Sequence, residues 1–341
     1  MDKTKGMVSI ILPVFNRQDF IEECINSVLA QSYQNFEIVI VDDGSSDNTF
    51  EICQNLAVKE PRIQLYRPEH GGVSAARNFA LKVASGEFVF FLDSDDVIYP
   101  CLLETLVLSM QKHNAAISGT CVHNVQAQRW EHIIKALLTE PQIGETAFLT
   151  HSETLDAVFH SRTPLDCIGG VMMRSDLIGT TEFHTDLYIG EDFYFIYENL
   201  IKGASSVFLK QKWYFARNHK HNISKDYSFD GFWTRFYRRV LVWRNEDALG
   251  RKEYADIQKR DAFGCFTRCF NHNPLSSSDS KRMRKALKEY KAELLPAFSR
   301  RVRLIILLYI YFPSLAVFVQ KTKRLFLNFK NNKQANESMN Q

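Results

Sequence analysis

The stretch EFVFFLDSDD (87–96) decides the fold of this chain, because an apolar run ends in three carboxylates. A short apolar run bounded by turn residues is typical of a strand buried on both faces of a parallel sheet. FEIVIVDDGSSD (36–47) repeats the arrangement, with Asp42 and Asp43 directly after the apolar run. Ligands of such sheets bind beyond the carboxyl ends of the strands. The two acidic clusters therefore predict one binding site at that edge of the sheet.

Strand and helix patterns alternate around these two stretches over the first 125 residues. We predict strands at 8–14, 36–41, 63–66, 87–92 and 116–122, and helices at 19–30, 48–59, 74–84 and 100–112. This alternation indicates an α/β fold with a Rossmann-like, mostly parallel sheet and helices on both faces. Further strands are expected at 167–173 and 205–209, helices at 151–160 and 191–202, and a loop with one helix at 126–150.

Length and composition set the expected domain organisation. The 341 residues, 45% of them apolar, suffice for one α/β domain and a smaller appendage. We place the α/β domain at 1–225, a helical C-terminal extension at 226–299, a membrane-associating segment at 300–330 and a disordered tail at 331–341. The best linker candidate is NPLSSSDS (273–280), because it gathers turn-forming residues.

Basic residues are unevenly distributed along the chain. The net charge is only +3, so no global basic field indicates nucleic acid as a partner. Between Arg300 and Lys330, however, there are seven basic residues and no acidic one, around a run of 16 apolar residues at 304–319. A spanning helix needs about 20 apolar residues, and this run contains Pro313. We expect it to lie in or dip into an anionic membrane surface; a buried helix and a true span are the alternatives.

The compartment follows from the N-terminus and the cysteines. MDKTKGMVSIILPVF (1–15) has a charged start, but its apolar run ends without a cleavage site and is better explained as a strand. The seven cysteines form no CxxC pair, which disfavours a zinc ribbon and favours reduced thiols. We therefore expect a cytoplasmic protein that is peripheral on the inner face of the cell membrane.

The DSDD segment is the strongest chemical signal. Asp93, Asp95 and Asp96 repel one another at a strand end, and a cation would compensate their charge. Oxygen ligands suit magnesium or manganese, which also take phosphate oxygens as ligands. Such an ion would hold a diphosphate and stabilise it as a leaving group. The alternative is a solvated acidic turn or a helix cap.

Two further segments could hold a nucleotide. Asp43 in VDDGSSDNT could accept a hydrogen bond from a base or a ribose hydroxyl, or Asp42 and Asp43 could merely shape the turn at Gly44. HGGVSAARN places Arg77 one turn into a helix, and a helix start attracts anions. The chain lacks both GxGxxG and GxxxxGK[ST] at this place, which disfavours dinucleotide and P-loop binding.

The last two segments could supply a base and a further phosphate ligand. Glu191 and Asp192 in YIGEDFYF open a helix, where a carboxylate could deprotonate an attacking hydroxyl or simply complement the helix dipole. Arg217, His219 and His221 in YFARNHKHNIS could reach a diphosphate or a metal, although exposed histidines are the more common outcome.

These segments, in this order, resemble family 2 of the glycosyltransferases, which has the GT-A fold. The resemblance covers roughly 7–225 and is carried by SIILPVFN, VDDGSSDNT, GGVSAARN, FLDSDD and GEDFYF. It implies an inverting, metal-dependent hexosyltransferase. Such an enzyme would move a sugar from a UDP-sugar or related donor to a hydroxyl of a glycan or lipid-linked acceptor in cell-surface polysaccharide synthesis. His221 departs from the family pattern, which usually has a small residue there.

The resemblance also implies a role for each site residue. The nucleotide sugar would contact Pro13, Phe15, Asn16, Asp42, Asp43, Arg77, Asp93, Ser94, Asp95 and His219. A manganese or magnesium ion would be held by the DxD motif of Asp93 and Asp95, with Asp96 and His219 as further candidates. Asp192 would be the catalytic base with Glu191 supporting it, and Gly170 and Met172 would lie near the acceptor.

Three other functions compete with this interpretation. A nucleotide-sugar-binding module without turnover would not need the complete carboxylate set. A sugar nucleotidyltransferase usually has a glycine-rich basic loop after the first strand, where this chain has PVFNRQDF (13–20). A processive synthase should have several spanning helices, and the sequence has at most one candidate for a span, at 304–319.

Overall fold

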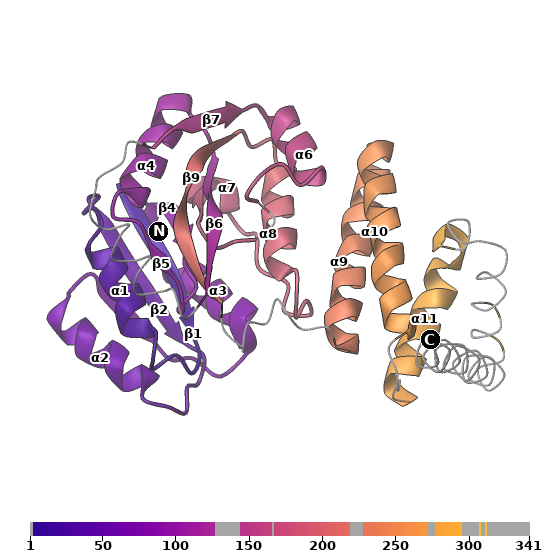
Figure 1. The fold of residues 1–341 in the computed structure, drawn as a ribbon, viewed down its shortest axis with the longest axis horizontal. Helices are drawn as coiled ribbons and strands as arrows, with labels where there is room; N and C mark the ends of the chain where they lie inside the picture. Colours follow the sequence, from indigo (N-terminus) through magenta and orange to yellow (C-terminus); the bar gives the residue numbers. More distant parts are fainter. Residues whose placement is uncertain are drawn as a thin grey trace, which may run out of the picture. The chain divides into compact units, whose positions relative to one another are not determined.

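The computed structural model describes residues 3–126, 144–165, 167–218, 228–271 and 277–294, together with Leu307 and Tyr311. The chain forms two compact units, Met1–Asp226 and Tyr227–Gln341 (Figure 1). Among the sequence predictions, His219, His221, most of 300–330 and the tail at 331–341 lie outside the described residues.

One mixed sheet organises the first unit. In the described part of the chain it has nine strands in the order β3-β2-β1-β4-β8-β6-β9-β5, with β7 pairing β9. The strands are β1 (Thr4–Val14), β2 (Phe36–Asp42), β3 (Ile63–Tyr66), β4 (Gly86–Phe91), β5 (Val97–Ile98), β6 (Ile117–Gln126), β7 (Thr146–Leu149), β8 (Val171–Arg174) and β9 (Ser206–Asn218). The α/β fold class that the sequence indicates is confirmed.

The strands β3, β2, β1 and β4 form a wholly parallel half of the sheet. The central strand β1 is buried from Val8 to Val14, and β2 is buried along its whole length. Continuous apolar runs form such strands because both faces are covered by other elements. Val14 pairs with Asp42, and Ile11 pairs with Phe91. The carboxyl ends of β1, β2 and β4 therefore leave the sheet at the same edge.

The other half of the sheet adds antiparallel pairs. The strand β8 runs antiparallel to both β4 and β6, and β5 and β7 run antiparallel to β9. The strands β6 and β9 pair in parallel. Because β5 directly follows the DSDD segment and pairs with the end of β9, the second half of β9 lies beside that segment.

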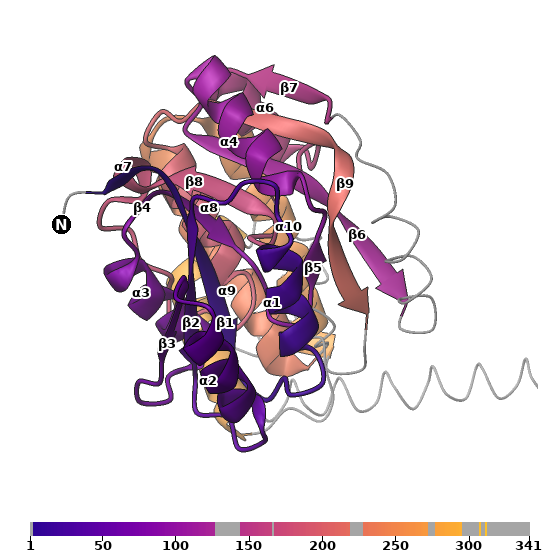
Figure 2. The ribbon, with the colours of Figure 1, turned by 90° about the vertical axis from the view of Figure 1, so that its left-hand side faces the viewer.

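Helices cover both faces of the sheet (Figure 2). They are α1 (Ile21–Leu29), α2 (Thr49–Lys59), α3 (Gly72–Val83), α4 (Leu102–His113), α6 (His151–Phe159), α7 (Ser175–Ile178) and α8 (Glu191–Leu200). The helices α1 and α4 pack on the face that carries Ile10 and Leu12. On the opposite face, Phe91 contacts Phe195 of α8 edge to face. This is the two-sided cover that the alternating pattern predicts.

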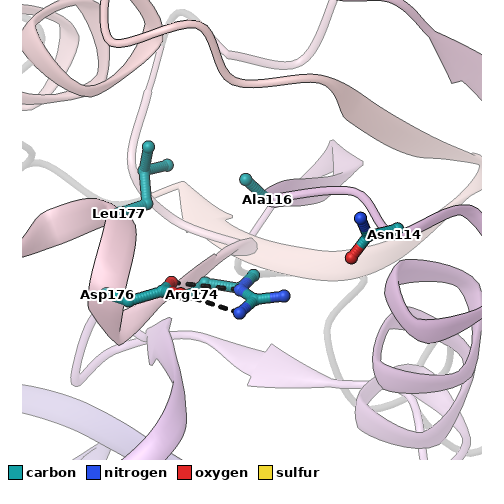
Figure 3. Close-up of a pocket in the computed structure, with 5 residues that line it drawn as sticks. All are labelled: Asn114, Ala116, Arg174, Asp176 and Leu177. Carbon is teal, nitrogen blue, oxygen red and sulfur yellow. Dashed lines mark hydrogen bonds and ion pairs between the residues drawn. The ribbon is translucent and has the colours of Figure 1, made fainter.

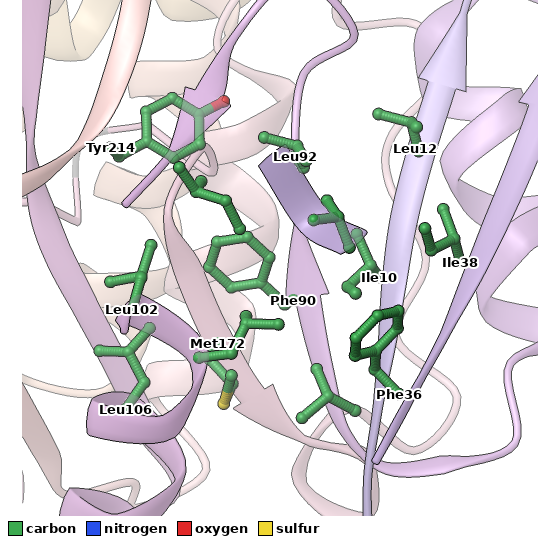
Figure 4. Packing of buried hydrophobic residues seen from close by; sticks show 14 of the residues in the cluster. Ile10, Leu12, Phe36, Ile38, Phe90, Leu92, Leu102, Leu106, Met172 and Tyr214 are labelled. Atoms are coloured by element: carbon green, nitrogen blue, oxygen red, sulfur yellow. The ribbon is translucent and has the colours of Figure 1, made fainter. Parts of the chain in front are cut away.

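The core between the sheet and the first helix layer is formed by large apolar side chains (Figure 4). Phe90, Leu102 and Tyr214 are each at most 1% exposed. Burying one such side chain stabilises the fold by about 1.5 to 3 kcal/mol. Met172 belongs to this core and is fully buried. The expectation that Met172 lies near an acceptor stays a prediction, and the structure places its side chain in this core.

The second unit contains three long helices among its described residues, α9 (Phe229–Ala248), α10 (Lys252–Asn271) and α11 (Ser277–Leu294). Their shared core includes Phe236 and Trp243 of α9, Phe266 of α10 and Met283 of α11. The turn between α9 and α10 contains Gly250 with a φ of 72°, in the left-handed region that glycine adopts readily. No helix in the described ranges has both the length and the apolar character needed to cross a membrane.

Several sequence predictions are corrected by the structure. The stretch 126–150 was expected to be a loop with one helix, yet it contains the strand β7, which pairs with Ser206–Leu209 of β9. The two-residue strand β5 was not expected, and β9 extends to Asn218 instead of ending at residue 209. The linker candidate 273–280 is helical from Ser277 onward, while 272–276 lie outside the described residues. The strands β5 and β7 and the extended part of β9 form because they pair with strands that are distant in the sequence. Local sequence patterns do not encode such pairing.

Candidate functional site

The acidic segments after β2 and β4 lie at one edge of the sheet. The backbone N–H of Asp43 donates to the carbonyl of Val14 (2.9 Å), and that of Leu92 donates to the carbonyl of Ile11 (3.1 Å). The parallel pairing thus continues until the chain reaches Asp43 on one side of β1 and Asp93 on the other. Phe15, which follows β1, comes out between them.

Asp42 and Asp43 are both buried and both bind backbone N–H groups. Oδ1 of Asp42 accepts from the N–H groups of Gly44 (2.8 Å) and Ser45 (2.7 Å). The Asp43 carboxylate accepts from Gly71 (2.8 Å) and Gly72 (2.9 Å) at the start of α3. Asp42 therefore shapes the turn at Gly44, and Asp43 fixes the N-terminus of α3. A contact between Asp43 and a base stays a prediction, and it would use the remaining lone pairs of the carboxylate.

Phe15 and His70 present two aromatic rings beside Asp43. Phe15 is 44% exposed, and its ring centroid lies 5.3 Å from that of His70 at an interplanar angle of 30°. Nδ1 of His70 lies 2.6 Å from the Asp43 carbonyl and 2.9 Å from its Oδ2, so this nitrogen carries the proton. The rings could stack on a planar base. The sequence did not single out His70, although it stands directly before the glycines of HGGVSAARN.

Pro13 and Asn16 flank Phe15 at the point where β1 ends and the next loop begins. Pro13 is buried in β1 opposite Val41, so Phe15 offers more surface to a ligand. Asn16 has a φ of 51°, and its side-chain carbonyl accepts from the N–H of Ser46 (2.8 Å). Asparagine tolerates this left-handed conformation better than most residues. Asn16 thus connects the loop after β1 with the loop after β2.

The three carboxylates of DSDD bind three different partners. Asp93 is partly exposed and forms an ion pair with Arg77 (3.0 Å). Asp95 lies 3.5 Å from Nε of Arg17. Asp96 is buried, and its Oδ1 accepts from the backbone N–H of Arg217 (2.9 Å). Ser94 between them is buried as well. Asp93 and Asp95 thus pair with arginine side chains from separate parts of the sequence, whereas Asp96 accepts from a backbone amide.

The hydroxyl of Tyr214 on β9 is hydrogen bonded to the DSDD turn. This hydroxyl accepts from the N–H of Asp93 (3.1 Å) and is hydrogen bonded to the Asp96 side chain. Burial, followed by the negative charges of Asp96 and Asp93, raises the pKa of Tyr214 well above its usual value. A Cβ atom at Gly169 would lie 2.8 Å from the Tyr214 hydroxyl, so only glycine fits there. This support was not predicted.

Arg77 joins the two carboxylate segments. Its guanidinium donates from Nη2 to Asp93 (3.0 Å) and from Nη1 to Glu191 (3.0 Å), and it lies 5.2 Å from the Phe183 ring centroid. Arg77 is only 5% exposed. The sequence indicated a contact with the base or the diphosphate, and that contact stays a prediction, because both ends of the guanidinium fork hold carboxylates here. The observed role is a bridge from α3 to the end of β4 and the start of α8.

Glu191 and Asp192 differ in exposure. Glu191 is buried against Arg77, whereas Asp192 is half-buried and its Oδ1 accepts from the N–H of Phe193 (2.7 Å). Burial and the charge of Asp192 raise the pKa of Glu191 to about 7, against the lowering effect of Arg77. Gly190, with a φ of 91°, precedes the helix and turns the chain so that both residues fall in its first turn. Asp192 is therefore the more accessible of the two carboxylates.

The donor set of DSDD fits a divalent cation. Burial, together with the charges of Asp95 and Asp93, raises the pKa of Asp96 well above its usual range, and a cation would relieve that repulsion. Among the described residues no three His, Cys, Asp or Glu side chains converge as a ready-made metal cage. Magnesium is commonly held by one or two carboxylates with waters and substrate phosphates, so a protein cage is not required. His219, the other candidate ligand, lies outside the described residues.

A separate cavity of about 340 Å³ lies elsewhere on the sheet (Figure 3). It is lined by Asn114, Ala116, Arg174, Asp176 and Leu177, and Arg174 pairs with Asp176 (2.7 Å). Arg174 pairs across the sheet with Phe88, at the amino end of β4. The cavity therefore lies at the edge opposite the DSDD segment and contains none of the predicted site residues.

Comparison with known proteins identifies the family. Residues 9–178 match the family "Glycosyl transferase family 2". Glycosyltransferase GlyG of Streptococcus pneumoniae is 37% identical over 112 residues, which cover 33% of this chain and 37% of that protein. The uncharacterized glycosyltransferase EpsJ of Bacillus subtilis is 32% identical over 155 residues, 46% of this chain and 43% of that protein. The chain thus matches less than half the length of these relatives, and its first unit belongs to glycosyltransferase family 2.

Solved structures share the fold over most of the chain. TarS 1–349 of Staphylococcus aureus in complex with UDP-GlcNAc has a TM-score of 0.62 at 21% identity, covering 89% of this chain and 87% of that one. The mannosyltransferase PcManGT of Pyrobaculum calidifontis, in complex with GDP-Man and Mn²⁺, has a TM-score of 0.53 at 16% identity, covering 91% and 86%. The fold is accordingly of the GT-A type, as the resemblance implied.

Proposed function

We propose that the chain is an inverting glycosyltransferase that moves a sugar from a nucleotide-diphosphate donor to an acceptor hydroxyl. The observation that carries the proposal is the Arg77 bridge between Asp93 and Glu191. It holds a cation-binding segment and a base-bearing helix start at the same sheet edge, where the donor and the acceptor must meet. Membership in glycosyltransferase family 2 supports the same reaction class.

The donor would lie across the carboxyl ends of β1, β2 and β4. Its base would stack on Phe15 and His70 beside Asp43, and its diphosphate would extend toward Asp93 and Asp95. These two carboxylates, with Asp96 and His219 as further candidates, would hold a manganese or magnesium ion. Such an ion, when bound, supplies positive charge to a diphosphate leaving group. TarS and PcManGT, with UDP-GlcNAc and with GDP-Man and Mn²⁺, support this class of donor and metal.

Asp192 would act as the catalytic base. The acceptor hydroxyl gives its proton to the Asp192 carboxylate, and its oxygen forms a bond to the anomeric carbon from the face opposite the diphosphate. The bond between that carbon and the phosphate oxygen breaks, and the diphosphate leaves with the electron pair. One displacement inverts the anomeric configuration, and no covalent sugar–enzyme intermediate is formed. Glu191 and Arg77 would keep the start of α8 in place.

We further propose a UDP-sugar as the donor and a glycan or lipid-linked acceptor in cell-surface polysaccharide synthesis. Segment 300–330, with its basic borders and apolar centre, would hold the protein on the cytoplasmic face of the membrane. The names of the curated relatives support glycosyl transfer but no particular sugar.

A panel of UDP- and GDP-sugars tests the proposal. Donor hydrolysis without acceptor is measured with manganese and again after adding EDTA. We expect one or a few UDP-sugars to be hydrolysed and the chelator to abolish hydrolysis. Hydrolysis that EDTA leaves unchanged would contradict the metal site. Donor binding by calorimetry without any hydrolysis, with or without acceptor glycans, would instead favour the non-catalytic binding module.

A further inference from the structure

The two compact units carry opposite net charges. Residues 1–226 contain 19 basic and 29 acidic residues, a net charge of −10. Residues 227–341 contain 23 basic and 10 acidic residues, a net charge of +13. The near-neutral total of +3 hides this difference. A strong charge asymmetry between two parts of a chain indicates an anionic partner for the basic part.

Helix α11 presents part of this charge on one face. Met283, Ala286 and Tyr290 are buried and belong to the core of the second unit. Lys281, Lys285 and Lys288 are exposed and stand at positions i, i+4 and i+7. Residues at this spacing lie above one another on a helix, so the three lysines form one stripe about 10 Å long.

The lysine stripe differs from the other basic residues around it in having no counter-charge. Arg282 pairs with Asp230 (2.6 Å), Arg244 with Glu289 (3.5 Å) and Lys259 with Asp247 (3.0 Å). In the described part of the chain, Lys281, Lys285 and Lys288 form no ion pair or hydrogen bond, so their charges are open to a partner from outside.

We propose that Lys281, Lys285 and Lys288 bind the headgroups of an anionic lipid surface, as a second contact in addition to the one proposed for segment 300–330. This inference rests on the membrane-associated part of the proposed function. A membrane suits the stripe because it offers phosphates over an extended plane, and because the same unit contains the apolar run 304–319 with its basic borders. The first unit has a net charge of −10 and is repelled by an anionic surface, so only the second unit is attracted to it.

Vesicle co-sedimentation of the full chain tests this contact. Phosphatidylcholine vesicles are compared with vesicles that also contain phosphatidylglycerol, at low and high salt. Each basic residue near an anionic surface strengthens binding about fivefold, so K281Q/K285Q/K288Q should weaken binding about 100-fold. The matched control K59Q/K112Q/K212Q removes three exposed lysines from the first unit and should leave binding within about twofold of wild type.

The outcomes distinguish binding through α11 from binding through segment 300–330 and from the proposed enzymatic activity. Wild-type binding by the α11 variant, with loss of binding only in R300Q/R301Q/R303Q, would overturn the proposal and assign all attraction to segment 300–330. Equal binding to neutral and anionic vesicles would overturn it as well. Donor hydrolysis in solution needs no membrane, so the same preparations report independently on the proposed function: hydrolysis can fail while anionic binding persists, and the reverse.

Discussion

The two acidic clusters at the sheet edge are held in different ways. Asp42 and Asp43 bind backbone N–H groups of the turns that they shape, at 2.7 to 2.9 Å. Asp93, Asp95 and Glu191 instead face the side chains of two arginines, Arg17 and Arg77. Backbone amides cannot leave without refolding the turn, whereas an arginine can change partner. The first cluster is therefore a fixed frame, and the second is a charge-compensated set in which a cation and a diphosphate can rearrange the pairs.

The largest expected effect concerns Asp192, the proposed base that follows Glu191 at the start of α8. Asp192→Asn should lower the transfer rate by about 100- to 10,000-fold, because an amide cannot take the proton of the acceptor hydroxyl. Donor affinity should stay near the wild-type value, since Asp192 would not contact the diphosphate. Steady-state rates and calorimetric donor binding measure the two quantities.

Asp186→Asn provides the matched control for this change. Asp186 is exposed in the loop before α8, so the same substitution there should leave the rate unchanged. An Asp192→Asn enzyme that keeps more than a tenth of the wild-type turnover would remove the base assignment and leave Asp192 as a partner of the helix dipole.

The next effect tests whether arginine pairing and amide pairing differ in energy. Arg77→Met leaves Asp93 and the buried Glu191 without their shared partner, and removing one member of a buried pair costs about 3 to 5 kcal/mol of unfolding free energy. Asp43→Asn weakens charge-assisted hydrogen bonds and should cost about 1.5 to 3 kcal/mol. Denaturant unfolding measures the free energy of unfolding of the two variants, provided that both show the same dependence of this free energy on denaturant concentration.

Adding Glu191→Gln to Arg77→Met should recover part of the lost stability, because the unpaired buried charge is removed. Arg77→Lys should recover little, since an ammonium cannot hold two carboxylates with a planar fork. Equal stability of Arg77→Met and wild type would mean that the bridge is not a buried ion-pair network, and the contrast between the clusters would fail.

Much of the parallel half and its site can be predicted from the sequence, for local reasons. The apolar runs before Asp42 and Asp93 are continuous, so both the strands and the point where they end are visible in the sequence. The start of α8 at Glu191 is equally visible, because an acidic pair precedes a helical pattern. Parallel strands bring their carboxyl ends to one edge, which is why two separate segments could be assigned to one site.

The partners of the carboxylates could not be predicted in the same way. Tyr214 supports the DSDD turn from 121 positions further along the chain, and Arg77 binds Glu191 from 114 positions away. Such contacts depend on how β9 and α8 return to the sheet, and no local pattern encodes that return. β5 and β7 were missed for the same reason, since a strand of two to four residues is stabilised by its neighbour more than by its own sequence.

The smallest expected effect is a pH dependence of stability that comes from Glu191. Glu191 has a pKa of about 7 in the folded chain against an ordinary value of 4.5, so the folded state binds its proton more tightly than the unfolded state. Stability from this group is complete below pH 4.5 and is lost as the pH rises toward 7, by at most about 3 kcal/mol. Glu191→Gln removes the titration, so wild type should lose stability relative to this variant between pH 5 and pH 8. If the unfolding free energies of the two proteins changed with pH in the same way across that range, the raised pKa of Glu191 would be contradicted. Arg77 would then be a strong enough partner to keep Glu191 ionised throughout.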